Sequence, residues 1–329
     1  MPTVSSFFEI LPPLPQGPLP VAISECLVGG EVRHDGGHKR SSLPHDKLDG
    51  LFAFKPICPE VGIGMGVPRE AIRLVGEVER PRAVGARDSS FDVTAKLSEF
   101  AIGQRGALNE VDGHIFTKNS PSCGLHRVKV YGDKDTPPDP NGRGIYAAQV
   151  TRDNPDLPVE ENGRLLDPVL RENFVTRTFV HAHWRALVAA GITAEKVIAF
   201  HSAYKFLVMA HSVKAYRQLG RLLSDLSGDI ASIAVSYFSQ LMQALAKPAS
   251  RGGHANVLSH LQGYVKNEMS KSARRELADL IESYRRGEVP LMAPLALLKH
   301  HLGEHEVTYA WNQLYLRPHP QGAGLRREL

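Results

Sequence analysis

Residues 19–27 read LPVAISECL, an apolar run that passes into a polar pair and a cysteine. A short apolar run that follows a proline and ends at a polar loop is typical of a buried strand. The same pattern returns at residues 51–57 and 114–117, and residues 91–108 carry apolar side chains at helical spacing. Strands that alternate with helices predict an α/β fold with a mostly parallel, Rossmann-like sheet and flanking helices.

Each of the three cysteines follows one of these predicted strands. Cys26 comes after the first strand, Cys58 after the second and Cys123 after the third. Because ligands bind beyond the carboxyl ends of the strands in a parallel sheet, we expect the three thiols to meet at one edge. The sequence has no Cys-x-x-Cys pair, which disfavours zinc ribbons, ferredoxin-type clusters and thioredoxin-like redox chemistry. On spacing alone, a metal centre and buried structural thiols both remain open.

Polar groups that suit catalysis stand beside two of the cysteines. Glu60 follows Cys58 by two residues, where it would act as a general base or as an ordinary helix-start carboxylate. Ser120 and Ser122 place two hydroxyls beside the third thiol in the turn SPSCG, residues 120–124. These three side chains are the candidate catalytic residues.

Basic residues near the same motifs are candidates for binding an anion. Residues 29–40 read GGEVRHDGGHKR, a composition that suits a phosphate-facing loop or a solvated one. Arg33 lies in this stretch. Arg69 follows the glycine-rich residues 62–66, where it would grip an anion or join a surface ion pair.

The composition is that of an ordinary globular protein. The chain has 329 residues, 42% of them apolar, and a net charge of +4, which allows a nucleic-acid partner without demanding one. No apolar run is long enough to cross a membrane, and the proline-rich residues 1–17 predict an extended lead and no secretory signal. Three cysteines do not make a disulfide framework in a chain of this length, so reduced thiols and a cytoplasmic location are expected.

The second half of the sequence predicts an all-α domain. A helix is expected from Pro168 to residue 190, and further helices follow from Thr193 onward. From residue 193 to the end there are 17 Lys and Arg against 11 Asp and Glu, which suits either an anionic ligand or a solvated helical surface. The adjacent pair His300 and His301 suggests a metal site, but neighbouring helical residues point about 100° apart, so core or surface histidines are favoured.

The first half, taken together, resembles the thiouracil desulfidase family of bacteria. The pieces that carry the resemblance are SECL at residues 24–27, the glycine-rich basic stretch at 29–39, CPE at 58–60 with its glycine-rich continuation to Pro68 and Arg69, and TKNSPSCG at 117–124. The resemblance covers residues 18–190. Residues 193–325 resemble a helical domain of unknown function that often follows it, with HSAYKFLVMAHS at 201–212 as one mark.

The resemblance implies a [4Fe-4S] cluster that Cys26, Cys58 and Cys123 hold, with one iron free of protein ligands. It implies a non-redox, hydrolytic desulfuration of thiouracil or of 4-thiouridine monophosphate, a nucleotide derived from tRNA. The products would be uracil or UMP and sulfide.

The chemistry of this reaction suggests roles for the neighbouring side chains. Glu60 would move the proton of the attacking water, with Ser120 preferred over Ser122 as the hydroxyl that assists it. Arg33, Arg69 and Lys118 would bind the ring oxygen or a phosphate.

Two other functions are compatible with these residues. The first is a non-catalytic iron–sulfur protein that binds RNA through its basic helical half or senses redox state. Glu60 and Ser120 count against it, since a passive cluster does not need them. The second is a zinc site with three cysteines and an activated water.

Overall fold

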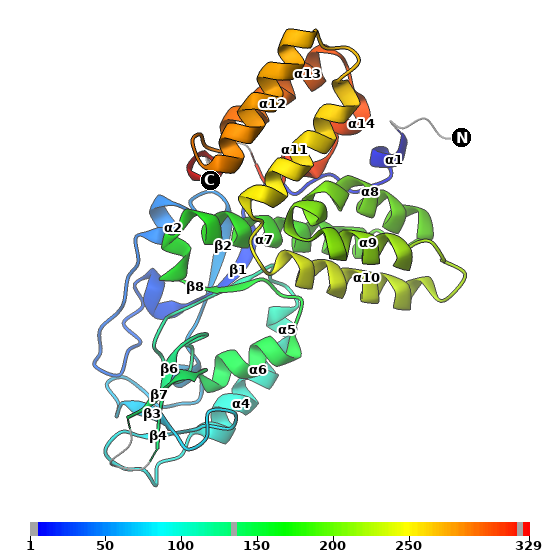
Figure 1. Ribbon diagram of the computed structural model, residues 1–329. Helices are drawn as coiled ribbons and strands as arrows, with labels where there is room; N and C mark the ends of the chain where they lie inside the picture. The colour runs from blue at the N-terminus through cyan, green and yellow to red at the C-terminus, as the bar shows by residue number, and fades with distance from the viewer. Residues whose placement is uncertain (1–5, 133–136, 321–324) are drawn as a thin grey trace. The chain divides into compact units, whose positions relative to one another are not determined.

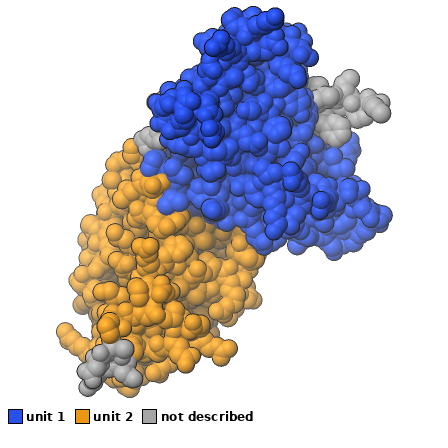
Figure 2. All heavy atoms as spheres, in the orientation of Figure 1, with its two compact units in different colours: residues 1–16, 168–329 blue, residues 17–167 orange. Residues whose placement is uncertain are grey.

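The structure, a computed structural model, divides the chain into two compact units (Figure 2). The α/β unit is Gly17–Asp167, and the helical unit combines Met1–Gln16 with Pro168–Leu329. Within them the structure describes residues 6–132, 137–320 and 325–329.

The division between the units differs from the expected domain boundary. We expected residues 18–190 to form the first domain, but the long helix α7 (Pro168–Ala189) belongs to the helical unit. The reason is that α7 packs against α10 (Ile230–Leu245) of that unit. The described part of the expected lead, residues 1–17, also packs in the helical unit, where the ring of Phe8 contacts Tyr309.

Sheet A confirms the predicted α/β fold (Figure 1). Its strands are all parallel and follow the order β2-β1-β5-β8. The fully buried Val21, Ala22 and Ile23 lie in the central strand, which explains why this run is apolar on both faces. The bounds are β1 (Leu19–Ser24), β2 (Phe52–Ile57), β5 (His114–Phe116) and β8 (Val159–Glu161).

Sheet B was not predicted. It has mixed strand directions and the order β4-β3-β6-β7, with only the central pair parallel. Its bounds are β3 (Ile72–Val75), β4 (Arg82–Gly85), β6 (Val128–Tyr131) and β7 (Asp139–Gly142).

Helices α4 (Thr94–Gly103) and α6 (Ile145–Asp153) pack against each other in the α/β unit. The rings of Phe100 and Tyr146 lie 6.0 Å apart at this contact. The helical stretch expected at residues 91–108 is two helices, because a glycine ends α4 and the chain starts again at α5 (Arg105–Leu108).

The helical unit is built around one apolar core that includes Trp184, Phe200, Tyr204 and Tyr237. Several of its helices begin at a side chain that accepts a hydrogen bond from a first-turn backbone N–H, among them Thr193, as expected. No described helix has both the length and the hydropathy that a membrane span requires. The remaining bounds are α1 (Ser6–Glu9), α8 (Ala194–His211), α9 (Val213–Leu222), α11 (Arg251–Val265), α12 (Lys271–Arg286), α13 (Met292–Glu304) and α14 (Thr308–Trp311).

Buried histidines should make the stability of the helical unit depend on pH. His254 is buried beside Tyr315, with 3.0 Å between Nδ1 and the phenol oxygen, and burial lowers its pKa to about 3. Burial likewise lowers the pKa of His201 to about 4. The unfolded chain therefore binds more protons below about pH 6.5, so stability is complete above that pH and is lost as the pH falls toward the folded pKa values. We expect the free energy of unfolding to decrease by roughly 1 kcal/mol per pH unit for each such histidine.

Urea unfolding between pH 7.5 and 5 would measure this dependence. Both tryptophans of the chain, Trp184 and Trp311, lie in the helical unit, so their fluorescence reports on this unit alone. A His254→Asn variant should show a shallower dependence than a variant of the exposed His260. Equal slopes for the two variants would refute the assignment.

Candidate functional site

The three cysteines line one cavity at the carboxyl ends of the sheet A strands. Cys26 lies in a 3₁₀ turn directly after β1, and Cys58 precedes the short helix α3 (Pro59–Gly62) directly after β2. Cys123 lies in the turn that follows β5. The parallel register pairs Ser24 with Ile57, so the loops leave the sheet at the same level. All three thiols face a cavity of about 240 Å³, and the expected convergence is observed.

The donor set suits an iron–sulfur cluster. Three free thiols from separate loops line one cavity of about 240 Å³. Soft thiolates are the usual ligands of such clusters, so these residues fit the group. Zinc takes the same donors, so metal analysis distinguishes the two.

Burial keeps the free thiols protonated. It raises the pKa of Cys26 and Cys58, and it raises the pKa of Cys123 well above its ordinary value. The hydroxyl of Thr117 and the charge of Lys39 oppose the shift at Cys26. Because metals bind thiolates, loading the site must release protons.

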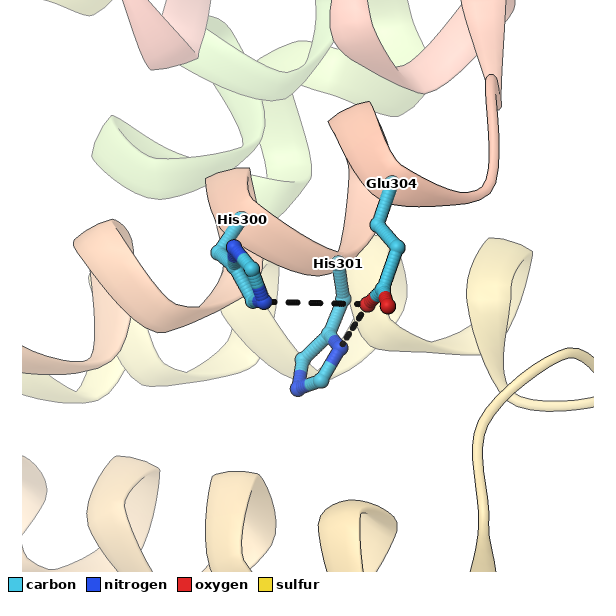
Figure 3. Close-up of side chains that lie close together, drawn as sticks. All are labelled: His300, His301 and Glu304. Carbon is cyan, nitrogen blue, oxygen red and sulfur yellow. Dashed lines mark ion pairs between the residues drawn. The ribbon is translucent and has the colours of Figure 1, made fainter.

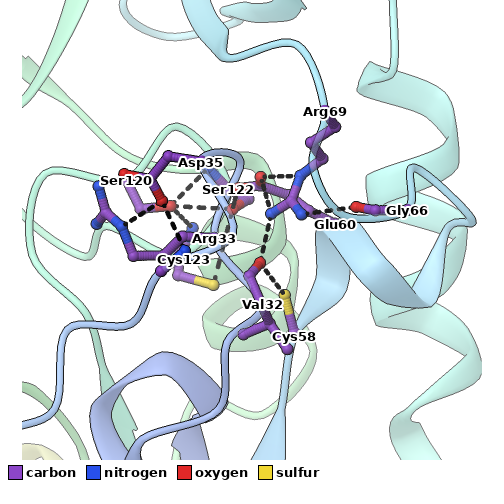
Figure 4. A network of polar contacts seen from close by, with 11 residues as sticks. Val32, Arg33, Asp35, Cys58, Glu60, Gly66, Arg69, Ser120, Ser122 and Cys123 are labelled. Atoms are coloured by element: carbon purple, nitrogen blue, oxygen red, sulfur yellow. Dashed lines mark hydrogen bonds and ion pairs between the residues drawn. The ribbon is translucent and has the colours of Figure 1, made fainter.

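The two serines and Glu60 form a connected hydrogen-bond chain (Figure 4). Ser122 Oγ lies 2.6 Å from Glu60 Oε1 and 2.9 Å from Ser120 Oγ. A carboxylate can only accept, so Ser122 donates to Glu60, and Ser120 then donates to Ser122. The backbone N–H of Cys123 donates to Ser120 Oγ over 3.0 Å, which fixes the outer hydroxyl of the chain. Ser122, which we had placed second to Ser120, is thus the hydroxyl that contacts Glu60.

Arg69 positions Glu60, and this differs from the anion-binding role expected for it. Its Nη2 lies 2.7 Å from Glu60 Oε2, and its Nε lies 3.0 Å from the same oxygen. Its other contacts are the carbonyl oxygens of Val32, at 2.8 Å from Nη2, and Gly66, at 2.9 Å from Nη1. With a side chain only 4% exposed, Arg69 directs its donors at the protein and is not free to grip a substrate.

Lys39 occupies the place at the cavity that we expected for Lys118. Lys39 and Arg33 line the cavity, whereas Lys118 is not among its lining residues and lies with its side chain over Gly163. Burial, and then the charge of Arg33, lower the pKa of Lys39. Lys39 was not predicted individually, although residues 29–40, which contain it, were predicted to suit a phosphate-facing loop.

The first turn of α6 holds the Cys123 turn in place. The backbone N–H of Ile145 donates to the carbonyl of Pro121 over 3.0 Å, and that of Ala147 donates to Ser122 over 3.1 Å. Gly144 permits this approach, because a Cβ there would lie 2.5 Å from the backbone of Ser122.

Comparison with known proteins assigns this region to a family. Residues 21–162 match the sequence model of the 2-thiouracil desulfurases, and this range contains every residue that lines the cavity. Residues 21–162 therefore form a 2-thiouracil desulfurase domain. Behind the desulfurase domain, residues 205–320 match a protein family of unknown function, DUF1722.

Two further similarities were found. The uncharacterized protein YbgA of Escherichia coli K12 is 33% identical over 157 residues, which cover 47% of this chain and 93% of that protein. The solved structure of the [4Fe-4S]-dependent thiouracil desulfidase TudS is 27% identical, with a TM-score of 0.37, over 45% of this chain and 93% of that one. The two family matches lie inside the expected ranges, 18–190 for the desulfurase domain and 193–325 for the helical domain.

Proposed function

We propose that this protein removes sulfur from thiolated uracil compounds at a [4Fe-4S] cluster that Cys26, Cys58 and Cys123 hold. The observation that supports the proposal is the meeting of three thiols from separate loops at one cavity, within the range that matches the 2-thiouracil desulfurases. The reaction is hydrolytic: water replaces the sulfur on the ring carbon, and uracil or UMP leaves with hydrogen sulfide. No net electron transfer occurs.

The residues around the cavity would hold the cluster, transfer protons and orient the attacking water. When bound, such a cluster with an iron free of protein ligands supplies a soft Lewis acid for the thiocarbonyl sulfur. Glu60, held by Arg69, takes the proton of the attacking water and returns it to the departing sulfur. The proton reaches Glu60 along the hydrogen-bond chain: Ser120, whose hydroxyl orients the water, donates to Ser122, and Ser122 donates to Glu60.

Arg33 and Lys39 favour a nucleotide as the substrate. Both basic side chains line the cavity, while the third, Arg69, is used up by Glu60. A phosphate is the group that two such cations bind best, so 4-thiouridine monophosphate suits the cavity better than the free base.

Anaerobic reconstitution with iron and sulfide tests the proposal. We expect a brown protein with about four irons per chain, which releases sulfide from 4-thiouridine monophosphate without any redox partner. Iron analysis, absorption spectra and a sulfide assay measure these outcomes. A reconstituted protein that carries the cluster but forms no UMP would contradict the proposal, and so would protein made without oxygen that contains zinc and no iron.

Replacing Lys39 with glutamine should raise the KM for the nucleotide by roughly tenfold to a hundredfold, because a charge-assisted hydrogen bond contributes about 1.5–3 kcal/mol. The KM for free thiouracil should change little. Lys118→Gln is the matched control, since that side chain lies outside the cavity. A larger effect of the Lys118 variant would restore the role that the sequence suggested for it. The iron content of both variants must first match that of the unmodified protein.

Two expectations from the sequence stay predictions. RNA binding through the basic helical half is one, and salt-dependent tRNA binding without turnover would support it. A cytoplasmic location is the other, which the set of free thiols favours.

A further inference from the structure

Two histidines lie beside one carboxylate at the end of α13 (Figure 3). Glu304 Oε2 lies 3.6 Å from His300 Nε2 and 3.5 Å from His301 Nδ1. A third histidine, His305, has its Nε2 3.8 Å from the same oxygen. Among the described residues, His300, His301 and Glu304 are the set of three whose ligand atoms all lie within 4.8 Å of one another. This cluster lies in the helical unit, outside the desulfurase domain.

Adjacent helical residues point about 100° apart, which counted against a metal site at His300 and His301, but a third side chain joins the two. His300 and His301 point in different directions as adjacent helical residues, but Glu304 lies one turn later, at positions i+4 and i+3 from them. Its carboxylate therefore reaches both rings. His305 follows His301 by one turn, and the two rings stack with 6.2 Å between their centroids and 10° between their planes.

The distances match those between ligands of one metal ion. Nitrogen and oxygen ligands about 2.0–2.1 Å from a tetrahedral zinc ion lie about 3.3 Å from one another. The distances of 3.5 and 3.6 Å from Glu304 to His301 and His300 are slightly longer, so a small inward movement of the three side chains would close the site. They are too long for good hydrogen bonds, which argues against a network that is complete without an ion.

An unsatisfied nitrogen is the independent sign of a missing partner. His301 Nδ1 is inaccessible to solvent and has no hydrogen-bond partner, and the side chain of His301 is 12% exposed. Leaving a buried polar atom unpaired is unfavourable. The nearest charged atom to this nitrogen in the cluster is the Glu304 oxygen, so an ion between them would satisfy both.

We propose that His300, His301 and Glu304 bind a divalent transition-metal ion, with water completing its coordination. Imidazole and carboxylate donors suit zinc and its neighbours, and they do not suit magnesium or calcium. His300 and Glu304 are exposed, so the ion enters from solvent. The bound ion ties together the side chains of the last turn of α13. This site is separate from the cysteine cavity and does not depend on the proposed function.

Titration of the full chain with Co²⁺ and Zn²⁺ tests the site. Cobalt bound by thiolate gives intense near-ultraviolet charge-transfer bands, and cobalt bound by imidazole and carboxylate gives only weak visible bands. We expect each chain to bind one cobalt ion that shows only the weak visible bands. We also expect zinc to displace this cobalt and to raise the melting temperature that tryptophan fluorescence reports.

The decisive variants are Glu304→Gln and His301→Ala, with the exposed His260→Ala as the matched control. The first two substitutions should weaken binding of the cobalt ion that shows no thiolate bands by at least about tenfold. The control substitution should leave its affinity unchanged. Glu304→Gln changes one exposed side chain by a single atom, so it separates loss of a ligand from loss of folding. Unchanged cobalt binding in Glu304→Gln would overturn the proposal, as would cobalt bands from thiolate alone in the unmodified chain.

Discussion

Replacing Cys123 with serine is expected to abolish desulfuration and to prevent the cluster from assembling. The side chain is 5% exposed and lies in a turn that α6 holds by backbone hydrogen bonds, so no neighbouring group can move in to replace it. A serine hydroxyl is a hard, neutral donor at neutral pH, and iron–sulfur clusters require soft thiolates. Serine has nearly the same size as cysteine, so the fold should persist.

Iron content, absorption spectra and sulfide release under anaerobic conditions measure this result. Because the chain contains only three cysteines, a thiol titration of the unfolded variant must give two and thereby verifies the substitution. Circular dichroism, which reports on both units, should match that of the unmodified protein. A folded Cys123→Ser protein with a full complement of iron and full turnover would eliminate the proposed mechanism.

Glu60→Gln should lower kcat for desulfuration by about a hundredfold to ten-thousandfold while the cluster remains. Glutamine keeps the shape of the side chain but cannot accept the proton of water, and it removes the ion pair with Arg69. It also places an amide beside Ser122, whose hydroxyl donates to Glu60 Oε1 over 2.6 Å in the unmodified protein. The hydrogen-bond chain is thus interrupted at its inner end, while the three thiols keep their places.

The matched control is Glu99→Gln, the same substitution at an exposed position of α4. It should leave kcat unchanged. Iron analysis separates a catalytic defect from loss of the cofactor, because only the former keeps about four irons per chain. If Glu60→Gln retained full kcat with a complete cluster, another group would have to move the proton.

The sequence predicted those parts of the site that depend on the sheet alone. β1 is an apolar run, and β2 is apolar apart from Lys55. The cysteines come directly after these strands, in the loops at the carboxyl edge where a parallel sheet binds its ligands. Sheet B escaped prediction because its strands have four residues each. Charged residues such as Arg73 in β3 and Lys129 in β6 also interrupt the apolar runs. Such short segments give too little pattern to distinguish them from loops.

The sequence could not predict which basic side chains point into the cavity, because contacts across folded loops decide their directions. Arg69 and Glu60 are nine residues apart across a glycine-rich segment, and only the folded loop brings them into contact. Lys118 points away from the cavity and Lys39 lines it, because a side chain in a loop can point to either face of that loop. The boundary at Asp167 was missed because a helix pattern shows that α7 is a helix but does not show which unit it packs against.

The three cysteines lie in loops, while the register of β1, β2 and β5 is fixed by backbone pairing and by a fully buried apolar strand. Loss of the proposed cluster to oxygen would therefore leave the fold intact. We expect protein exposed to air to stay folded, and to regain the proposed activity when iron and sulfide are supplied again without oxygen.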